Sequence, residues 1–104
     1  MFARHVSIHL KSNMLSDYIR TFENDTLPLL RQQKGFKDEI TLSNPGSLDV
    51  VAVSLWDSKA NAETYNTNTY PKVLRTFERM IVGAPKVQTF EAVTSTFHKL
   101  AVGA

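Results

Sequence analysis

Apolar and polar residues alternate in the segment 4–11, near the start of the chain. Every second side chain there is apolar: Val6, Ile8 and Leu10. His5 and His9 lie between them and therefore share the opposite face. A period of two residues is typical of a β-strand with one buried face. The pattern predicts a first strand that carries two histidines on one face.

Two longer segments carry apolar residues at helical spacing. The first stripe consists of Leu15, Tyr18, Ile19, Phe22, Leu29 and Leu30. Ser12 or Asn13 could cap this helix, and Pro28 interrupts it, because proline suits the first turn of a helix and not its interior. The second stripe consists of Tyr70, Val73, Leu74, Phe77, Met80 and Ile81. Pro71 lies inside that pattern, and Ser58 is placed to cap the helix upstream of it.

Three further segments are typical of strands. The segment 36–43 alternates, and one of its sides is expected to carry Phe36, Asp38, Ile40 and Leu42. A turn at 44–46 joins it to the segment 48–57, so the two form an antiparallel hairpin. The last strand is predicted over 86–97. The order β-α-β-β-α-β predicts an α+β, ferredoxin-like fold with an antiparallel sheet, in one domain over residues 1–104.

Both predicted helices have to cover the same face of the sheet, because crossover connections share a hand. The other face keeps apolar side chains, since the segment 48–57 is apolar on both sides. An open sheet with an apolar second face normally packs on another sheet. We therefore expect a homodimer in which two sheets pack face to face and close a barrel between the chains.

Composition narrows the classes of function. The 104 residues carry a net charge of +2 with histidine neutral, and the basic residues are scattered, so a nucleic-acid partner is not expected. The absence of cysteine excludes disulfides, thiol catalysis and zinc–thiolate sites. The sequence has no pattern of a secretion signal and no apolar run long enough to span a membrane, so we expect a cytoplasmic protein.

Three segments together form a known pattern: Ser-Leu-Trp-Asp-Ser at 54–58, Ala-Asn-Ala-Glu-Thr-Tyr at 60–65 and Val-Gln-Thr-Phe-Glu-Ala-Val at 87–93. With the start of the first strand, they resemble the dimeric α/β-barrel superfamily, in particular the antibiotic-biosynthesis-monooxygenase-like (ABM-like) proteins. The resemblance covers nearly the whole chain. It implies a homodimer with one pocket in each chain, between the helices and the sheet.

The same resemblance leaves the activity open. Some relatives oxidise aromatic polyketides with O₂ and no metal or flavin, while others degrade haem, rearrange small metabolites or have no assigned activity, and the fold does not choose among them. Haem degradation is disfavoured here. The haem-degrading relatives carry an Asn, a Trp and a His where this chain has His5, Tyr65 and Arg75.

The candidate catalytic residues are His5 and His9, because a histidine can take a proton from a phenol or an enol near neutral pH. No third ligand is close to the pair, so neither a metal site nor a cofactor is predicted. Each histidine could instead be a hydrogen-bonded residue at the end of the sheet. His98 is expected to be solvated.

The candidate substrate-binding residues are aromatic: Trp56, Tyr65, Tyr70 and Phe22. Trp56 could stack on an aromatic ligand and donate from its indole nitrogen. Tyr65 and Tyr70 flank a polar stretch that could border a pocket mouth, and Phe22 becomes a wall if the helices stand off the sheet. The alternative for each of these residues is packing without a role in binding.

Two functions of different classes follow. The first is a small-molecule enzyme, in one version a cofactor-independent monooxygenase acting on an aromatic or enolisable substrate. The second is a non-catalytic ligand-binding or structural homodimer. A closed pocket of about 300 Å³ or more, with polar groups converging on it, favours the first function. A filled interface between helices and sheet favours the second.

Overall fold

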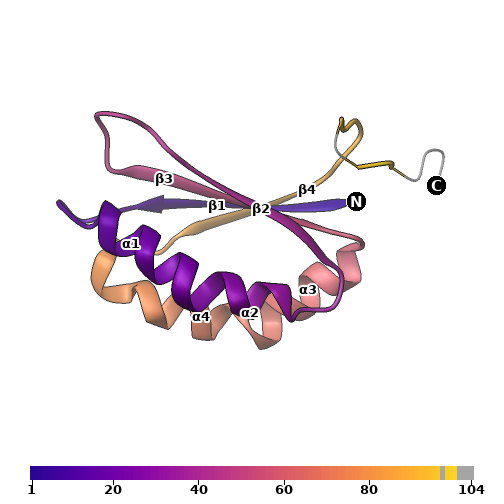
Figure 1. Cartoon of the computed structure of the whole chain (residues 1–104), viewed down its shortest axis with the longest axis horizontal. Coiled ribbons are helices and arrows are strands. Elements are labelled where there is room, and N and C mark those ends of the chain that lie inside the picture. Colours follow the sequence, from indigo (N-terminus) through magenta and orange to yellow (C-terminus); the bar gives the residue numbers. More distant parts are fainter. Residues whose placement is uncertain (97, 101–104) are drawn as a thin grey trace.

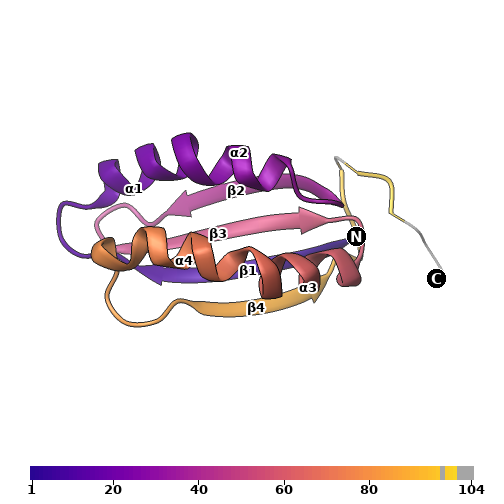
Figure 2. The ribbon, with the colours of Figure 1, turned by 90° about the horizontal axis from the view of Figure 1, so that it is seen from below.

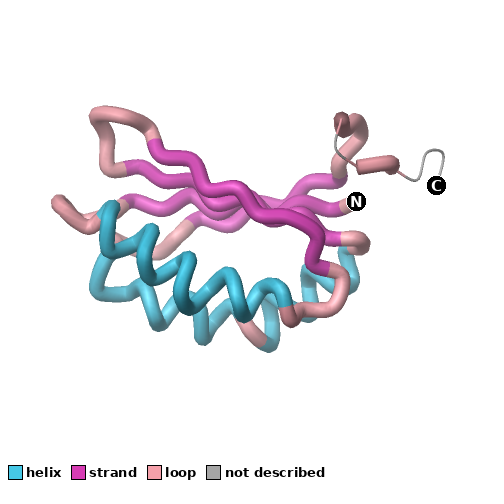
Figure 3. The backbone as a smooth tube through the Cα atoms, viewed as in Figure 1, coloured by secondary structure: helices cyan, strands magenta, loops and turns pink. Residues whose placement is uncertain are grey.

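The computed structural model describes residues 1–96 and 98–100. Its elements follow in the order β1 (Phe2–His9), α1 (Leu15–Thr21), a π-helical turn η1 (Phe22–Thr26), α2 (Leu27–Arg31), β2 (Phe36–Ser43), β3 (Asp49–Trp56), α3 (Lys59–Asn68), α4 (Tyr70–Phe77), a 3-10 turn η2 (Glu78–Met80) and β4 (Lys86–Glu91). Within the described residues, all helices lie on one side of a single sheet (Figures 1 and 3). The predicted α+β, ferredoxin-like architecture is confirmed.

The strand order is β2-β3-β1-β4, and every neighbouring pair is antiparallel. The helices run over this sheet as two rods, α1–α2 on the β2 side and α4–α3 over the β1 side (Figure 2). Side chains of residues that pair across strands point to the same face. The register therefore sorts the sheet into a helix-facing side and a side that we call the open face.

Each of the two predicted long helices is divided near its proline. Pro28 has no N–H to donate to the carbonyl of Asn24, and its ring crowds that carbonyl, so the chain widens into the π-helical turn Phe22–Thr26 just before it. Near Pro71 the helix breaks at Thr69, where α3 ends and α4 begins.

The predicted caps have different outcomes. Ser58 caps α3, and its Oγ accepts a hydrogen bond from the backbone N–H of Asn61 at 3.2 Å. The prediction for the first helix is wrong. Met14 occupies the N-cap position of α1 without a side-chain hydrogen bond, and Asn13 instead takes a positive φ of 62° in the preceding turn.

A β-bulge in β2 changes the predicted facing of that strand. Phe36 pairs with Trp56, and after the irregularity between Phe36 and Asp38 the residue Glu39 pairs with Ser54. The extra residue reverses the alternation. Phe36 therefore faces the helices, whereas Ile40 and Leu42 face the open side, and the prediction of one common side for these residues is wrong.

The last strand is shorter than predicted. β4 ends at Glu91, and residues 92–96 form no strand. Residue 97, where the prediction placed the strand's end, lies outside the described residues, as do residues 101–104 of the predicted single domain. In the described part of the chain, no helix has the length and apolar character needed to cross a membrane.

The hydrophobic core lies between the helices and the sheet and is rich in aromatic rings. Trp56 is fully buried, and Tyr18 and Tyr65 are 1% and 4% exposed. The rings of Tyr18 and Phe77 lie 4.9 Å apart, and those of Trp56 and Tyr65 lie 5.0 Å apart. The first contact joins the two helical rods to each other, and the second joins α3 to the sheet; together they form walls of the site described next.

Candidate functional site

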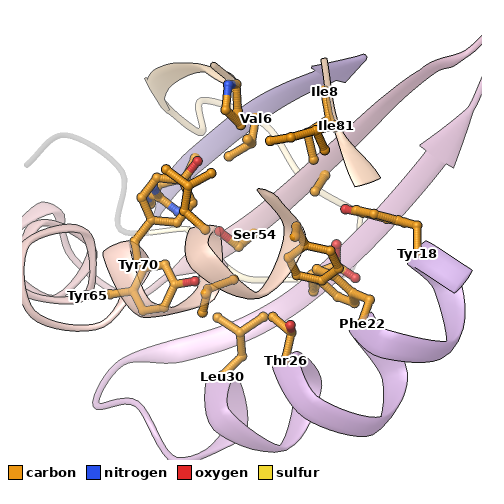
Figure 4. Close-up of a pocket in the computed structure, with 17 residues that line it drawn as sticks. Val6, Ile8, Tyr18, Phe22, Thr26, Leu30, Ser54, Tyr65, Tyr70 and Ile81 are labelled. Atoms are coloured by element: carbon orange, nitrogen blue, oxygen red, sulfur yellow. The ribbon is translucent and has the colours of Figure 1, made fainter. Parts of the chain in front are cut away.

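A cavity of about 50 Å³ lies between the helices and the helix-facing side of the sheet (Figure 4). Its apolar and aromatic lining includes Val6, Ile8, Tyr18, Phe22, Leu30, Tyr65, Tyr70, Val73, Phe77 and Ile81. Its polar lining includes Arg4, Thr26, Glu39 and Ser54. The enclosed volume suits one or two waters and is smaller than the roughly 150 Å³ in which a buried benzene is accommodated.

Three polar residues form a row across the floor of this cavity. Arg4 on β1 pairs with Ser54 on β3, and Ser54 pairs with Glu39 on β2. Adjacent strands lie about 4.8 Å apart, so the backbones of Arg4 and Glu39 are about 10 Å apart. The row therefore presents a guanidinium cation at one end, a hydroxyl in the middle and a carboxyl group at the other end.

Arg4 is 3% exposed and lies against two tyrosine rings. Its guanidinium carbon is 5.0 Å from the ring centroid of Tyr65 and 4.6 Å from that of Tyr70. One Nη donates to the Oδ1 of Asn66 at 2.8 Å. The buried Nε has no hydrogen-bond partner among the described residues. Burial lowers the pKa of Arg4, and the two tyrosines oppose that shift.

Glu39 is half-buried, and its carboxylate accepts a hydrogen bond from the hydroxyl of Thr41 at 2.6 Å. Burial raises the pKa of Glu39, because a low-polarity environment disfavours the carboxylate, while the hydrogen bond from Thr41 opposes the shift. A carboxyl group with a raised pKa beside an apolar cavity is suited to accept and return a proton.

Two hollows adjoin the cavity and share residues with it. One, of about 300 Å³, runs between α1 and β2 and shares Tyr18, Phe22 and Glu39. The other, of about 460 Å³, lies between α3 and the β1–β4 pair and shares Arg4. Each end of the polar row is therefore bordered by a hollow large enough for a small ring compound.

Three of the predicted binding residues line the cavity: Tyr65, Tyr70 and Phe22. The labelled side chains in Figure 4 show the two tyrosines on one side of the cavity and Phe22 on another. Burial raises the pKa of Tyr65 to about 12 and also raises that of Tyr70, so both hydroxyls are neutral at physiological pH. Their role in substrate binding stays a prediction.

Trp56 is not among the residues that line the cavity. It packs between Phe36 and Tyr65, and its indole N–H donates to the Oγ of Ser54 at 2.9 Å. Its donor and its ring faces are therefore used within the core. Trp56 orients Ser54 and Tyr65, and the predicted direct stacking on a ligand has no support in this arrangement.

His5 and His9 lie on the open face, because the helix-facing positions of β1 are Arg4, Val6 and Ile8. His9 contacts the carboxylate of Asp49 at 2.8 Å, with both side chains exposed. The ring of His5 meets Phe90 edge-on at 6.2 Å. The structure thus brings neither predicted base to the cavity. His98, expected to be solvated, contacts the carboxylate of Asp38 instead.

The sequence reasoning missed Arg4 and Glu39. A signal for Arg4 was available, since it occupies the same alternation as Val6 and Ile8, where a charged residue is out of place. Glu39 had no such signal, because its direction depends on the bulge. In the part of the chain that the structure describes, no three His, Asp or Glu residues gather into a possible metal site.

Comparisons of sequence give no match, since neither a protein-family model nor a curated protein matches this chain. Comparison of structures gives many matches. The monooxygenase ActVA-Orf6 of Streptomyces coelicolor, solved in complex with nanaomycin D, matches with a TM-score of 0.77 and 12% identity, over 94% of this chain and 92% of its own.

Two further structures have similar scores. SnoaB of Streptomyces nogalater, a cofactor-independent oxygenase, matches with a TM-score of 0.75 and 11% identity, over 93% of this chain and 97% of its own. NE2512 of Nitrosomonas europaea, a protein of unknown function, matches with a TM-score of 0.74 and 16% identity, over 98% of this chain and 95% of its own. Such likeness establishes the fold alone: the chain has the ABM-like fold of the antibiotic biosynthesis monooxygenases, as its sequence resemblance predicted.

Proposed function

We propose that the chain is a small-molecule enzyme of the ABM-like type, a cofactor-independent monooxygenase for an aromatic or enolisable substrate. The observation that carries this proposal is the polar row of Arg4, Ser54 and Glu39 on the floor of a cavity with aromatic walls. A carboxylate that accepts a proton and a guanidinium that holds negative charge, placed across an apolar space, are suited to form and stabilise an enolate. The names of the fold neighbours ActVA-Orf6 and SnoaB point to the same chemistry.

The proposed reaction converts a CH₂ group beside a carbonyl into a second carbonyl. Glu39 takes one proton from the CH₂ group, and the electron pair of that C–H bond forms the enolate. The enolate carbon bonds to O₂, and return of the proton gives a hydroperoxide. Loss of the second C–H proton then breaks the O–O bond and releases water. The substrate supplies all four electrons that reduce O₂, so the balance needs no cofactor.

A second function, a non-catalytic ligand-binding or structural homodimer, is favoured by one observation. The enclosed cavity holds about 50 Å³, so the interface between helices and sheet is nearly filled. On the enzyme proposal, the substrate uses the adjoining hollows of about 300 Å³ and 460 Å³ as well. The two functions therefore differ in whether a ring compound enters this space at all.

The proposed assembly is a homodimer through the open face. That face carries exposed apolar side chains on both edge strands, with Ile40 56%, Leu42 52% and Phe90 52% exposed. Apolar side chains of β3 adjoin Ile40 and Leu42, whereas β1, between β3 and β4, presents His5 and His9 to the same face. An exposed apolar patch on an open sheet is typical of an interface. The cytoplasmic location stays a prediction from the sequence.

Oxygen uptake with an anthrone- or quinol-type compound tests the catalytic proposal. We expect the wild-type protein to consume O₂ and the Glu39→Gln variant to be slower by about 100-fold, because the amide cannot take the proton. Glu78→Gln, at an exposed position of η2, is the matched control and is expected to keep the wild-type rate.

A second comparison distinguishes Glu39 from the histidines. The double variant His5→Ala/His9→Ala is expected to keep most of the activity, since both side chains lie on the open face. Loss of activity in the double variant together with full activity in Glu39→Gln would reverse the assignment of the base. Absence of oxygen uptake by the wild-type protein with every such compound would favour the non-catalytic function.

A further inference from the structure

The charge of Arg4 is not balanced within the described part of the chain. The side chain is 3% exposed, and none of the ion pairs there includes it. Arginine is almost never fully buried unless it is paired, because an isolated charge is costly in a medium of low polarity. A buried guanidinium that forms no ion pair among the described residues is therefore a candidate partner for an anionic ligand.

The groups around Arg4 orient it without neutralising it. The rings of Tyr65 and Tyr70 lie over the guanidinium, and their raised pKa values keep both hydroxyls neutral. The carbonyl oxygen of Asn66 accepts one hydrogen bond, and the Nε–H has no acceptor among the described residues. A guanidinium offers five N–H groups in a planar fork, which matches the two oxygens of a carboxylate.

Arg4 also lies where two spaces meet. It lines the cavity on one side and the hollow of about 460 Å³ on the other. The apolar lining of that hollow includes Phe2, Ala62 and Val87. A planar ring has room there, while a charged group on the ring reaches the guanidinium.

We propose that Arg4 is the anchor for an aromatic oxyanion, a carboxylate or a phenolate, and that this is the class of ligand the site selects. The assignment of such a ligand as substrate rests on the proposed function. In that reaction the substrate would approach Arg4 from the cavity side, with its enolate oxygen held by Arg4 and its acidic carbon directed to Glu39 at the other end of the row. The anion site itself is tested by binding alone.

Benzoate and benzamide are matched probes, since they share a ring and differ in charge. Binding of each to the wild-type chain is measured by calorimetry and by tryptophan fluorescence. We expect benzoate to bind at least about tenfold more tightly than benzamide, because a charge-assisted, two-point contact is available only to the carboxylate. In Arg4→Met this preference is expected to fall to within about twofold.

Arg75→Met is the control, because Arg75 lies on the exposed side of α4, and it is expected to keep the full preference. Equal affinity of the wild-type chain for both probes, or binding of neither below about 10 mM, would overturn the proposal. So would an unchanged preference in Arg4→Met. The wild-type comparison decides the matter even where Arg4→Met does not fold.

The two proposals fail separately. Preferential binding of benzoate without oxygen uptake in the assay above would overturn the monooxygenase and leave the anion site in place. Oxygen uptake with no preference for benzoate would overturn the anion site and leave the monooxygenase in place.

Discussion

Arg4 and His5 are neighbours in sequence, yet they serve different faces of the sheet. Arg4 lines the cavity under the helices, and His5 lies on the open face against Phe90. The period of two that makes β1 a strand also separates these side chains. Both residue types can carry a positive charge. The alternation of side chains along the strand therefore decides which of the two can reach a ligand under the helices.

At the same scale, Glu39 has a consequence for stability as a function of pH. Its pKa is raised in the folded chain by burial, so the unfolded chain releases this proton at lower pH. The stabilising contribution of the neutral form is therefore complete below the ordinary pKa of a glutamate. It is lost as the pH rises through the raised pKa of the folded state.

The Glu39→Gln variant lacks this titration. We expect the free energy of unfolding of the wild-type chain, relative to the variant, to fall between about pH 4 and about pH 8. Urea denaturation of both proteins at these two pH values measures the difference. A relative stability that rises with pH would show that Glu39 is not the desolvated group described above.

Whether a site residue could be predicted from the sequence depends on which interaction places its side chain. Tyr65, Tyr70 and Phe22 line the cavity because large aromatic residues at helical spacing point toward the sheet, and their role in binding stays a prediction. Trp56 does not line the cavity, because its buried indole finds its partner inside the protein, here Ser54. No sequence pattern indicates which of these two outcomes a given aromatic residue has.

At the scale of elements, the prolines and glycines set the boundaries that frame the site. The π-helical turn before Pro28 places Phe22 and Thr26 on the cavity wall. π-helical turns occur frequently at functional sites, where they redirect side chains. Between α2 and β2, Gly35 has a φ of 82°, and its carbonyl accepts a hydrogen bond from the N–H of Asp57 at 2.8 Å.

Gly35 and Gly46 form a matched pair for a stability test, because both have a φ of 82°. A Cβ at Gly35 would overlap the carboxylate of Asp57 and the amide of Asn61, whereas a Cβ at Gly46 would meet nothing within 4 Å. We expect Gly46→Ala to cost about 1 kcal/mol through its backbone conformation alone. Gly35→Ala is expected to cost about 1–3 kcal/mol more, through steric overlap.

Thermal denaturation and urea denaturation of the two variants measure this difference. Equal losses of stability in Gly35→Ala and Gly46→Ala would mean that the close approach of the α2–β2 connection to the start of α3 is relieved at no cost. That outcome would contradict the packing described for this end of the molecule.

Element order and strand pairing were predictable because they follow from periodicity and turn residues. The face to which each β2 side chain points was not predictable. The bulge adds one residue, and no Gly or Pro marks it in the segment Phe36, Lys37 and Asp38. The early end of β4 was equally hidden, since the Val- and Thr-rich residues that follow Glu91 favour a strand. The pattern of residue types within a segment does not show whether a neighbouring strand is available to pair with it.

At the scale of the whole molecule, the sheet has one covered face and one open face. The exposed Ile40 and Leu42 extend the apolar area of β3 to one edge, and Phe90 adds an apolar side chain on the other edge strand, beyond the histidines of β1. The wild-type chain is expected to sediment at twice its mass of 11.7 kDa at micromolar concentration. We expect Ile40→Lys to sediment as a monomer, because a lysine within the apolar part of the interface would bury a charge.

Ile19→Lys is the control for this prediction. Ile19 is 45% exposed on α1, away from the open face, so the variant is expected to remain a dimer. Analytical ultracentrifugation of the three proteins reads out the result. A wild-type monomer, or a dimer that Ile19→Lys dissociates and Ile40→Lys does not, would place the interface elsewhere or remove it.

The bulge between Phe36 and Asp38 has an evolutionary consequence. Because the bulge absorbs one extra residue, removal of Lys37 would leave Asp38 opposite Leu55 and Glu39 opposite Ser54. Two descendants of one ancestral gene could thus differ in length at this position and still direct the same acid to the ligand. A strand of the same length that pairs without the bulge would instead turn Glu39 outward, so an alignment of residue types alone would not reveal which face the acid occupies.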